Sequence, residues 1–235
     1  FLLTLCLSMC LSFSPREVKI HIIDQKGGGM VHELEGLPHL GTCLTKIDDT
    51  EIEEFMEAIE KEVGHRYQVL ERYSVSNIYQ YIKMQKISGE PMEDMPHIVI
   101  LFDEMEFMKV YEPKIFERLK ELGSRMNSAL LGVHLVFSTH QYAGVVDDSI
   151  YKMSDFKICS QMQKENLTVN TRDEADWHPG RLYLQLKSRS EIQLIQLAYC
   201  CNEIGVRNRD NYGWFFGKKS EKGELIDLIK RYELD

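Results

Sequence analysis

The sequence comprises 235 residues, of which 43% are hydrophobic and 28% charged, with 15 Gly and 6 Pro. These proportions are typical of a folded domain and exclude collagen, a coiled coil and a wholly disordered chain. The formal net charge of −9 disfavours binding to a phosphate backbone, which requires basic surface. The six cysteines form no CxxC pair and no zinc-binding spacing, so we expect reduced thiols.

The chain opens with an apolar segment, residues 1–13, that has the composition of a signal-peptide core. The segment has no basic region before it and no small-residue cleavage site, and it is too short to span a bilayer. We therefore expect a buried core helix, entered partway along its length, and no targeting signal.

The next elements alternate between apolar and polar segments. Residues 18–24 are rich in β-branched side chains and predict a strand that ends in an acid. Residues 25–29 include three consecutive glycines and predict a turn. Residues 51–72 carry apolar residues on one face and glutamates on the others, which indicates an amphipathic helix. The polar stretch 83–95 is expected to be a loop.

The remainder of the chain predicts further strands and helices. Apolar runs predict strands at residues 97–103, 132–139 and 156–159, an antiparallel hairpin at 181–197, and helices at about 113–131 and 220–235. Apolar strands that alternate with helices are typical of an α/β fold with a mostly parallel sheet and helices on both faces. We expect the late antiparallel hairpin to close this sheet.

Acidic and polar residues follow the predicted strands at Asp24, at Asp103 and Glu104, and at Gln141. In open α/β sheets, ligands bind beyond the carboxyl ends of the strands. The apolar run that ends in Asp103-Glu104 has the Walker B pattern, in which the aspartate holds Mg²⁺, directly or through water. The glutamate then deprotonates the water that attacks a γ-phosphate. Gln141 would sense that phosphate; the alternative is that these are ordinary polar strand ends.

A phosphate-binding loop is the missing counterpart of this pattern. No G-x-x-x-x-G-K-[ST] motif occurs in the 235 residues. Residues 27–29 are no substitute, because no Lys-Ser/Thr follows them and they open no clear helix. A phosphate cradle needs backbone N–H groups at a helix N-terminus. If the loop exists, we expect it just before Phe1.

Several motifs along nearly the whole chain resemble those of FtsK/SpoIIIE-type ATPase domains, and are most similar to those of type VII secretion motors of Gram-positive bacteria. The matching segments are FLLTL at 1–5, IIDQKGGGM at 22–30, LPHLGT at 37–42, MPHIVILFDE at 95–104, LGVHL at 131–135 with Thr139 and Gln141, GVVDD at 144–148, PGR at 179–181 and SEK at 220–222.

This resemblance implies a RecA-like P-loop NTPase domain over residues 1–217, with residues 218–235 as a C-terminal helix or inter-domain linker. It implies ATP and Mg²⁺ as ligands, with Asp103 holding the metal through water. The nucleotide-binding residues would be Asp103, Asp24, Lys26, Gly27, Gly28 and Thr139, and the catalytic residues Glu104 and Gln141. For Asp24 and Lys26 the alternative interpretation is a tight turn after a strand.

The same resemblance implies a biological setting. The domain would drive export of WXG100-type proteins, with other ATPase domains of the same chain and other subunits of the secretion machinery as partners. It would lie at the cytoplasmic face of the bacterial membrane, as a soluble part of a membrane-anchored protein. We expect no nucleic-acid partner and no membrane contact by this segment.

The sequence also departs from the family pattern. Met126 and Ala129 stand where the family usually has arginines, and Arg125 lies one position out of register, about 100° around the helix. His140 lies within the segment where the family commonly has the shorter sequence "ATQ". The segment 161–178 is shorter than is usual in the family. Loss of an arginine that stabilises transition-state charge lowers turnover by orders of magnitude.

Three functions therefore remain open. The first is an ATPase module of a secretion motor. The second is a degenerate, non-hydrolysing module that binds an export signal or regulates its neighbours, with residues 214–216 either forming a docking patch or packing on the core. The third is a DNA translocase, which the net charge of −9 and the lack of basic pore loops disfavour.

Overall fold

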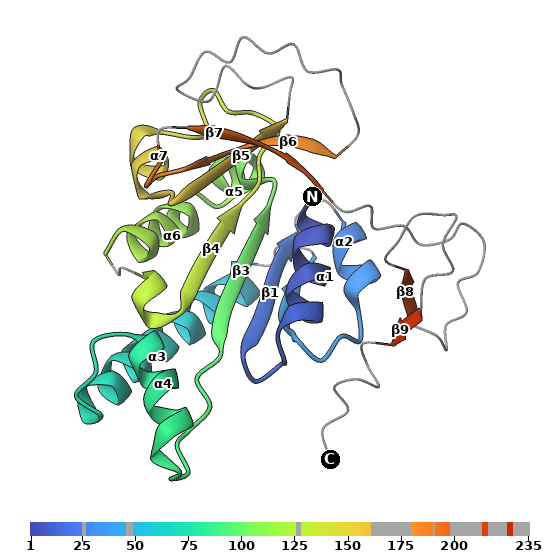
Figure 1. The fold of residues 1–235 in the computed structure, drawn as a ribbon. Helices are drawn as coiled ribbons and strands as arrows, with labels where there is room; N and C mark the ends of the chain where they lie inside the picture. The colour runs from blue at the N-terminus through green and yellow to red at the C-terminus, as the bar shows by residue number, and fades with distance from the viewer. Residues whose placement is uncertain are drawn as a thin grey trace. The chain divides into compact units, whose positions relative to one another are not determined.

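A computed structural model describes residues 1–24, 27–45, 49–125, 128–160, 180–189 and 191–197, together with the backbone of two short strands at 213–215 and 225–227 (Figure 1). The chain divides into two compact units. One unit comprises Met9–Val145, and the other comprises Phe1–Ser8 with Val146–Asp235.

A four-stranded parallel sheet forms the centre of the unit Met9–Val145. Its strands are β1 (Val18–Asp24), β2 (Leu40–Leu44), β3 (His97–Asp103) and β4 (Val133–Phe137), in the order β2-β1-β3-β4. All three pairings are parallel. The apolar residues of β1 and β3 are almost fully buried, as expected for strands covered on both faces. The predicted parallel α/β fold is confirmed.

Helices make the connections that parallel strands require. They are α2 (Gly29–Leu34), α3 (Asp49–Arg72), α4 (Ile78–Ser88), α5 (Met105–Tyr111) and α6 (Pro113–Arg125), followed by a 3₁₀ turn, η1 (Ser128–Leu131). The predicted apolar face of α3 is buried at Ile52, Met56, Ile59 and Val63. The single helix predicted over 113–131 corresponds to two elements, α6 and η1.

The apolar start of the chain is a helix, α1 (Leu2–Ser12). Cys6, Leu7 and Cys10 are fully buried, whereas Phe1 and Phe13 at its two ends are exposed. This confirms the predicted core helix. In the described part of the chain, no helix has both the length and the apolar character that crossing a membrane requires.

The second unit contains α7 (Asp148–Met153) and an antiparallel sheet of β5 (Phe156–Ser160), β6 (Arg181–Leu186) and β7 (Ile192–Gln196). The Asp147 side chain caps α7 by accepting a hydrogen bond from the N–H of Ile150 at 3.0 Å. The hairpin predicted at 181–197 is present as β6 and β7, but it does not close the parallel sheet. It pairs instead with β5, with Cys159 opposite Tyr183.

Three other local expectations were wrong. The segment expected to be a loop at 83–95 is helical through Ser88, because Asn77 caps α4 by accepting from Gln80 N–H at 2.9 Å and Gly89 ends it at φ 67°. The glycines 27–29 do lead into a helix, the six-residue α2. In the tail expected to be helical, β9 (Leu225–Asp227) pairs with β8 (Gly213–Phe215), a non-local contact that helical periodicity does not reveal.

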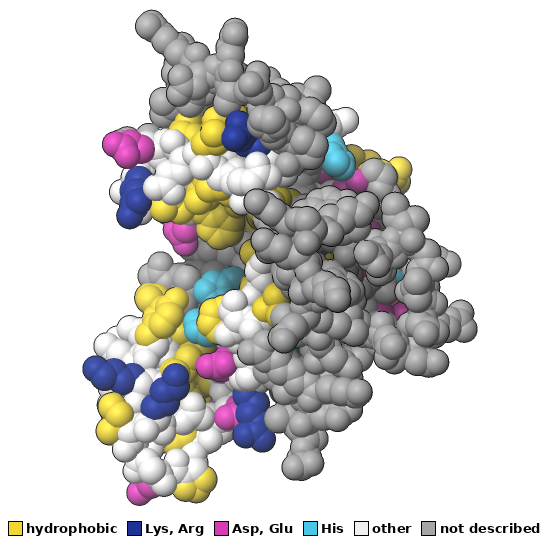
Figure 2. All heavy atoms as spheres, turned by 45° about the vertical axis from the view of Figure 1, so that its right-hand side comes forward, with side chains coloured by type: hydrophobic (Ala, Val, Ile, Leu, Met, Phe, Trp, Pro, Cys, Tyr) yellow, Lys and Arg dark blue, Asp and Glu magenta, His cyan; other side chains and the backbone are white. Residues whose placement is uncertain are grey.

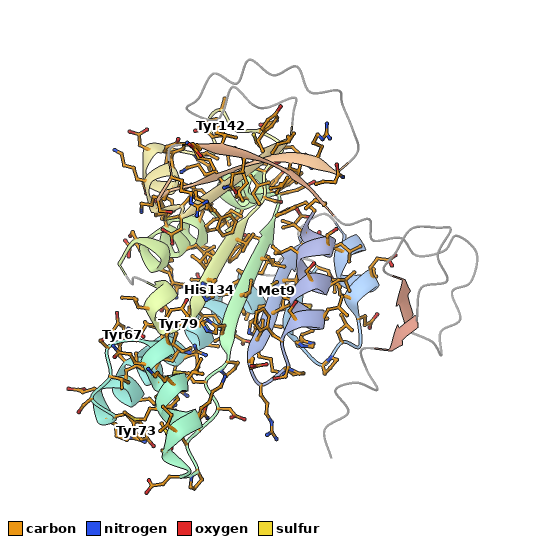
Figure 3. All side chains as sticks on the ribbon, in the orientation of Figure 1. Met9, Tyr67, Tyr73, Tyr79, His134 and Tyr142 are labelled. Carbon is orange, nitrogen blue, oxygen red and sulfur yellow. The ribbon has the colours of Figure 1, made fainter. Side chains whose placement is uncertain are left out.

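The edge of the parallel sheet where β3 and β4 begin is held by a fully buried arginine. Arg66, on α3, donates to the carbonyl oxygens of Leu131 at 2.8 Å and of Pro96 at 2.7 Å. Beside it, the rings of His97 and His134 stack at 5.2 Å, and Tyr79 packs on His97 at 5.6 Å (Figure 3). Arg66 thus joins α3 to the segments that lead into β3 and β4.

Candidate functional site

Two aspartates meet at the carboxyl edge of the parallel sheet. Asp24 is the last residue of β1 and Asp103 is the last residue of β3, and the two are partners in the strand register. Asp24 is only 3% exposed. The sequence prediction that these two strand ends share one edge is therefore confirmed.

Ser138 ties the end of β4 to the end of β3. Its hydroxyl donates a hydrogen bond to Asp103 Oδ1 and accepts one from the backbone N–H of Glu104 at 3.0 Å. Its backbone continues the ladder, with Ser138 N–H donating to Phe102 O at 2.9 Å and Met105 N–H donating to Ser138 O at 2.8 Å. Sequence reasoning missed Ser138, although it is the first polar residue after the apolar run of β4.

Glu104 occupies an unusual backbone conformation at the start of α5. Its φ of 56° and ψ of 60° lie in the left-handed region, which costs a residue other than glycine about 1 kcal/mol or more and is concentrated at functional sites. Glu104 is 4% exposed. The strained turn directs its carboxylate to His140, whose Nε2 lies 3.2 Å from Glu104 Oε1.

The segment after β4 forms a hydrogen-bonded turn. Thr139 Oγ1 donates to Gln141 O at 2.9 Å and accepts from Gln141 N–H at 3.1 Å. The N–H of His140 donates to Glu106 Oε1 at 3.0 Å. Burial alone would raise the pKa of Glu106, but hydrogen bonding at its carboxylate, including the bond from His140 N–H, outweighs burial and lowers that pKa. Glu106 is therefore a carboxylate at neutral pH.

The expected strand at 132–139 is shorter than predicted, because β4 ends at Phe137. Gln141 consequently lies four residues beyond the strand, in an exposed position, and its hydrogen bonds with Thr139 involve its backbone. Thr139 lies in the same turn. The sequence placed Gln141 at a strand tip, and this placement was wrong.

The glycine turn after β1 brings the chain back beside the sheet. Gly27 has φ 105° and Gly28 has φ 79°, conformations that only glycine adopts without strain. A Cβ on Gly28 would lie 2.8 Å from Thr45 Cγ2. The two predicted glycines are thus required by the turn itself. Lys26 lies outside the described residues, as do the side chains at positions 126 and 129.

The donor set at this edge suits a hard cation. Carboxylate and hydroxyl oxygens are what Mg²⁺ prefers, and Mg²⁺ retains waters and substrate phosphates around one or two protein carboxylates. Asp24 and Asp103 supply such a pair. Within the described ranges no cluster of three or more His, Cys, Asp or Glu has the arrangement of a protein-only metal cage.

Comparison with known proteins identifies the family of this chain. The model of the FtsK/SpoIIIE family matches residues 1–152, and the chain belongs to this family. It is 35% identical over 197 residues to the type VII secretion system protein EssC of Staphylococcus aureus (strain Mu50 / ATCC 700699), which covers 82% of this chain and 13% of the relative. It is 32% identical over 202 residues to the ESX secretion system protein EccC of Geobacillus thermodenitrificans, covering 83% and 14%.

Solved structures agree on the fold. The cytoplasmic domain of the type VII secretion ATPase EccC from Thermomonospora curvata superposes with a TM-score of 0.71 at 25% identity, over 84% of this chain and 24% of that one. EssC (ATPases 2 and 3) from Geobacillus thermodenitrificans gives 0.69 at 22% identity, over 83% and 36%. The fold is the RecA-like ATPase fold. The chain spans about an eighth of the length of its curated relatives.

Proposed function

We propose that this chain is an ATP-binding and ATP-hydrolysing module of a type VII protein secretion motor. The observation that carries the proposal is the juxtaposition of Asp24, Asp103 and Glu104 at the carboxyl edge of a parallel sheet. This is the edge at which open α/β folds bind ligands. The relatives named above are secretion proteins and ATPases, which supports the same assignment.

Each residue has a distinct task in this proposal. Asp103, with Asp24 beside it, would hold Mg²⁺ through water, and the ion would supply positive charge to the transferred phosphoryl group. Ser138 fixes the orientation of Asp103 through its hydroxyl. Glu104 accepts a proton from the attacking water, a role that contributes 10²–10⁴-fold in typical general-base catalysis.

The 235 residues contain no sequence motif of a phosphate-binding loop. We propose that this loop precedes α1, so that backbone N–H groups at the start of this helix bind the phosphates. Gly27, Gly28 and Thr139 would line the nucleotide from the sheet edge, together with Lys26.

The proposed work of the module is protein export. WXG100-type proteins would be the cargo, and other ATPase domains of the longer protein would be its neighbours at the cytoplasmic face of the membrane. A DNA-translocating role is disfavoured by the net charge of −9. On the face drawn in Figure 2, the coloured Lys and Arg side chains are scattered among acidic and apolar ones.

Nucleotide-dependent stabilisation tests the proposal. A chain extended upstream through the phosphate loop is heated with and without Mg²⁺ and a non-hydrolysable ATP analogue. At about 100 times the dissociation constant, binding adds about 2.7 kcal/mol to the free energy of unfolding. Asp103→Asn should lose the Mg²⁺-dependent part, whereas Asp94→Asn, an exposed control, should keep it. No stabilisation of the unmodified chain at saturating analogue would refute ATP binding.

The second candidate is a module that binds nucleotide without hydrolysing it. Met126 and Ala129, where the family usually has arginines, favour it. Full stabilisation by the ATP analogue combined with no phosphate release from ATP would select this function over the first.

A further inference from the structure

We propose that His140 is the positioning residue for the Glu104 carboxylate. This inference rests on the proposed ATPase function and adds to it the group that orients the base. Its starting point is the 3.2 Å separation between His140 Nε2 and Glu104 Oε1.

The two side chains differ sharply in exposure. The Glu104 side chain is 5% exposed and that of His140 is 77% exposed. The imidazole therefore covers the carboxylate from the solvent side, and its Nε2–H donates to Oε1. A hydrogen bond to an ionised acceptor is stronger than one between neutral groups, so this contact favours one orientation of the carboxylate.

The backbone of each partner is fixed independently of this contact. Ser138 Oγ accepts from Glu104 N–H at 3.0 Å, which holds the left-handed turn. Glu106 Oε1 accepts from His140 N–H at 3.0 Å, which holds the segment after β4 against α5. His140 Nε2 then contacts the Glu104 carboxylate itself, at 3.2 Å from Oε1.

Gln141 contributes to the turn after β4 through its backbone. Its backbone closes the turn with Thr139 through two hydrogen bonds, at 2.9 and 3.1 Å. The turn directs His140 toward Glu104 and leaves Gln141 exposed one residue further on. In hydrolytic sites a base is itself oriented by a third group, and here the described geometry gives that role to His140.

Kinetics of the upstream-extended chain test the inference. His140→Ala should lower kcat for ATP by about tenfold, the order of loss seen when the partner that orients an active-site ligand is removed. The dissociation constant of the nucleotide analogue should not change. His140→Gln should recover part of kcat, because its amide N–H donates at a similar reach, and His140→Leu should not. His65→Ala is a matched control, since it removes an exposed histidine–glutamate pair, with Glu93 at 2.9 Å, elsewhere in the same unit; its kcat should equal that of the unmodified chain.

The possible outcomes separate the two proposals. Unchanged kcat in His140→Ala, in a chain whose turnover is abolished by Glu104→Gln, overturns the role of His140 and leaves the ATPase assignment intact. A lack of turnover in the unmodified chain overturns the ATPase assignment and this role with it.

A spectroscopic measurement tests the contact itself without turnover. In ¹⁵N-labelled protein, the Nε2–H signal of the His140 ring should shift or broaden in Glu104→Gln and stay in place in Glu93→Gln. A His140 ring signal that neither shifts nor broadens in either variant would contradict the proposed orientation.

Discussion

Asp24 and Asp103 are partners in the register of β1 and β3, and each is the last residue of its strand. Adjacent carboxylates repel one another unless a cation or donor lies between them. Ser138 donates to Asp103, and a divalent cation would offset the remaining repulsion. This relationship makes the carboxyl edge of the sheet suited to Mg²⁺ and phosphate.

Ser138→Ala is expected to destabilise the site in two ways. It removes the donor to Asp103 and the acceptor for Glu104 N–H. Each lost hydrogen bond costs about 1 kcal/mol, so the free energy of unfolding should fall by about 2 kcal/mol in urea denaturation. Ser138→Thr, which keeps the hydroxyl, should lose less than Ser138→Ala, and equal losses would argue against the bridge.

Gly28→Ala and Gly29→Ala form a matched pair in the glycine turn. Alanine at position 28 needs φ 79° and places Cβ 2.8 Å from Thr45 Cγ2, so we expect a loss of more than about 1 kcal/mol. A Cβ at position 29 meets no atom within 4 Å, and this position begins α2, so Gly29→Ala should be neutral or stabilising. Thermal unfolding of the two variants should differ in this order; the reverse order would contradict the described turn.

Arg66→Met tests the other edge of the sheet. It leaves the carbonyl oxygens of Leu131 and Pro96 without their buried donor. Each buried carbonyl left without its donor costs about 1–3 kcal/mol, so the free energy of unfolding should fall by more than about 2 kcal/mol. Arg16→Met, at an exposed arginine, should change the free energy of unfolding by less than about 0.5 kcal/mol. A small effect at both positions would show that Arg66 does not anchor α3.

Acid should destabilise the fold through His97 and His21. Burial lowers the pKa of each to about 4, helped at His97 by His134 and Arg66 and at His21 by Lys19. The unfolded chain, with an ordinary histidine pKa of about 6.5, binds more protons between pH 6.5 and 4. The free energy of unfolding should therefore decrease as the pH falls through this range.

The slope of that decrease is measurable. Each histidine contributes up to about 1.4 kcal/mol per pH unit, and His97→Asn removes the contribution of His97. Urea denaturation at a series of pH values should show a shallower slope for this variant. An unchanged slope would exclude His97 as a source of the pH dependence.

The sequence was most informative where local pattern and burial agree. The apolar runs of β1 and β3 predicted both strands and their acidic ends, because strands covered on both faces must be apolar throughout. β2 was missed, since its exposed and half-buried residues give no such run. The β6–β7 hairpin is local and was predicted, whereas the pairing of β5 with β6 joins segments far apart in the sequence, which periodicity does not encode.

At the site, sequence reasoning found Asp24, Asp103 and Glu104 but not their supports. Ser138 and His140 matter through hydrogen bonds to residues about 35 positions away. β4 ends at Phe137, two residues earlier than predicted, and the turn that follows brings His140 to Glu104. Only the three-dimensional register supplies that information.

The rate of ATP hydrolysis by the Glu104→Gln variant tests the central claim most directly. In single-turnover assays with the upstream-extended chain and Mg-ATP, the account predicts that Glu104→Gln binds the nucleotide as tightly as the unmodified chain and hydrolyses it at least about 100-fold more slowly. Equal rates of phosphate release from the two proteins would contradict the claim that Glu104 is the base at this edge of the sheet.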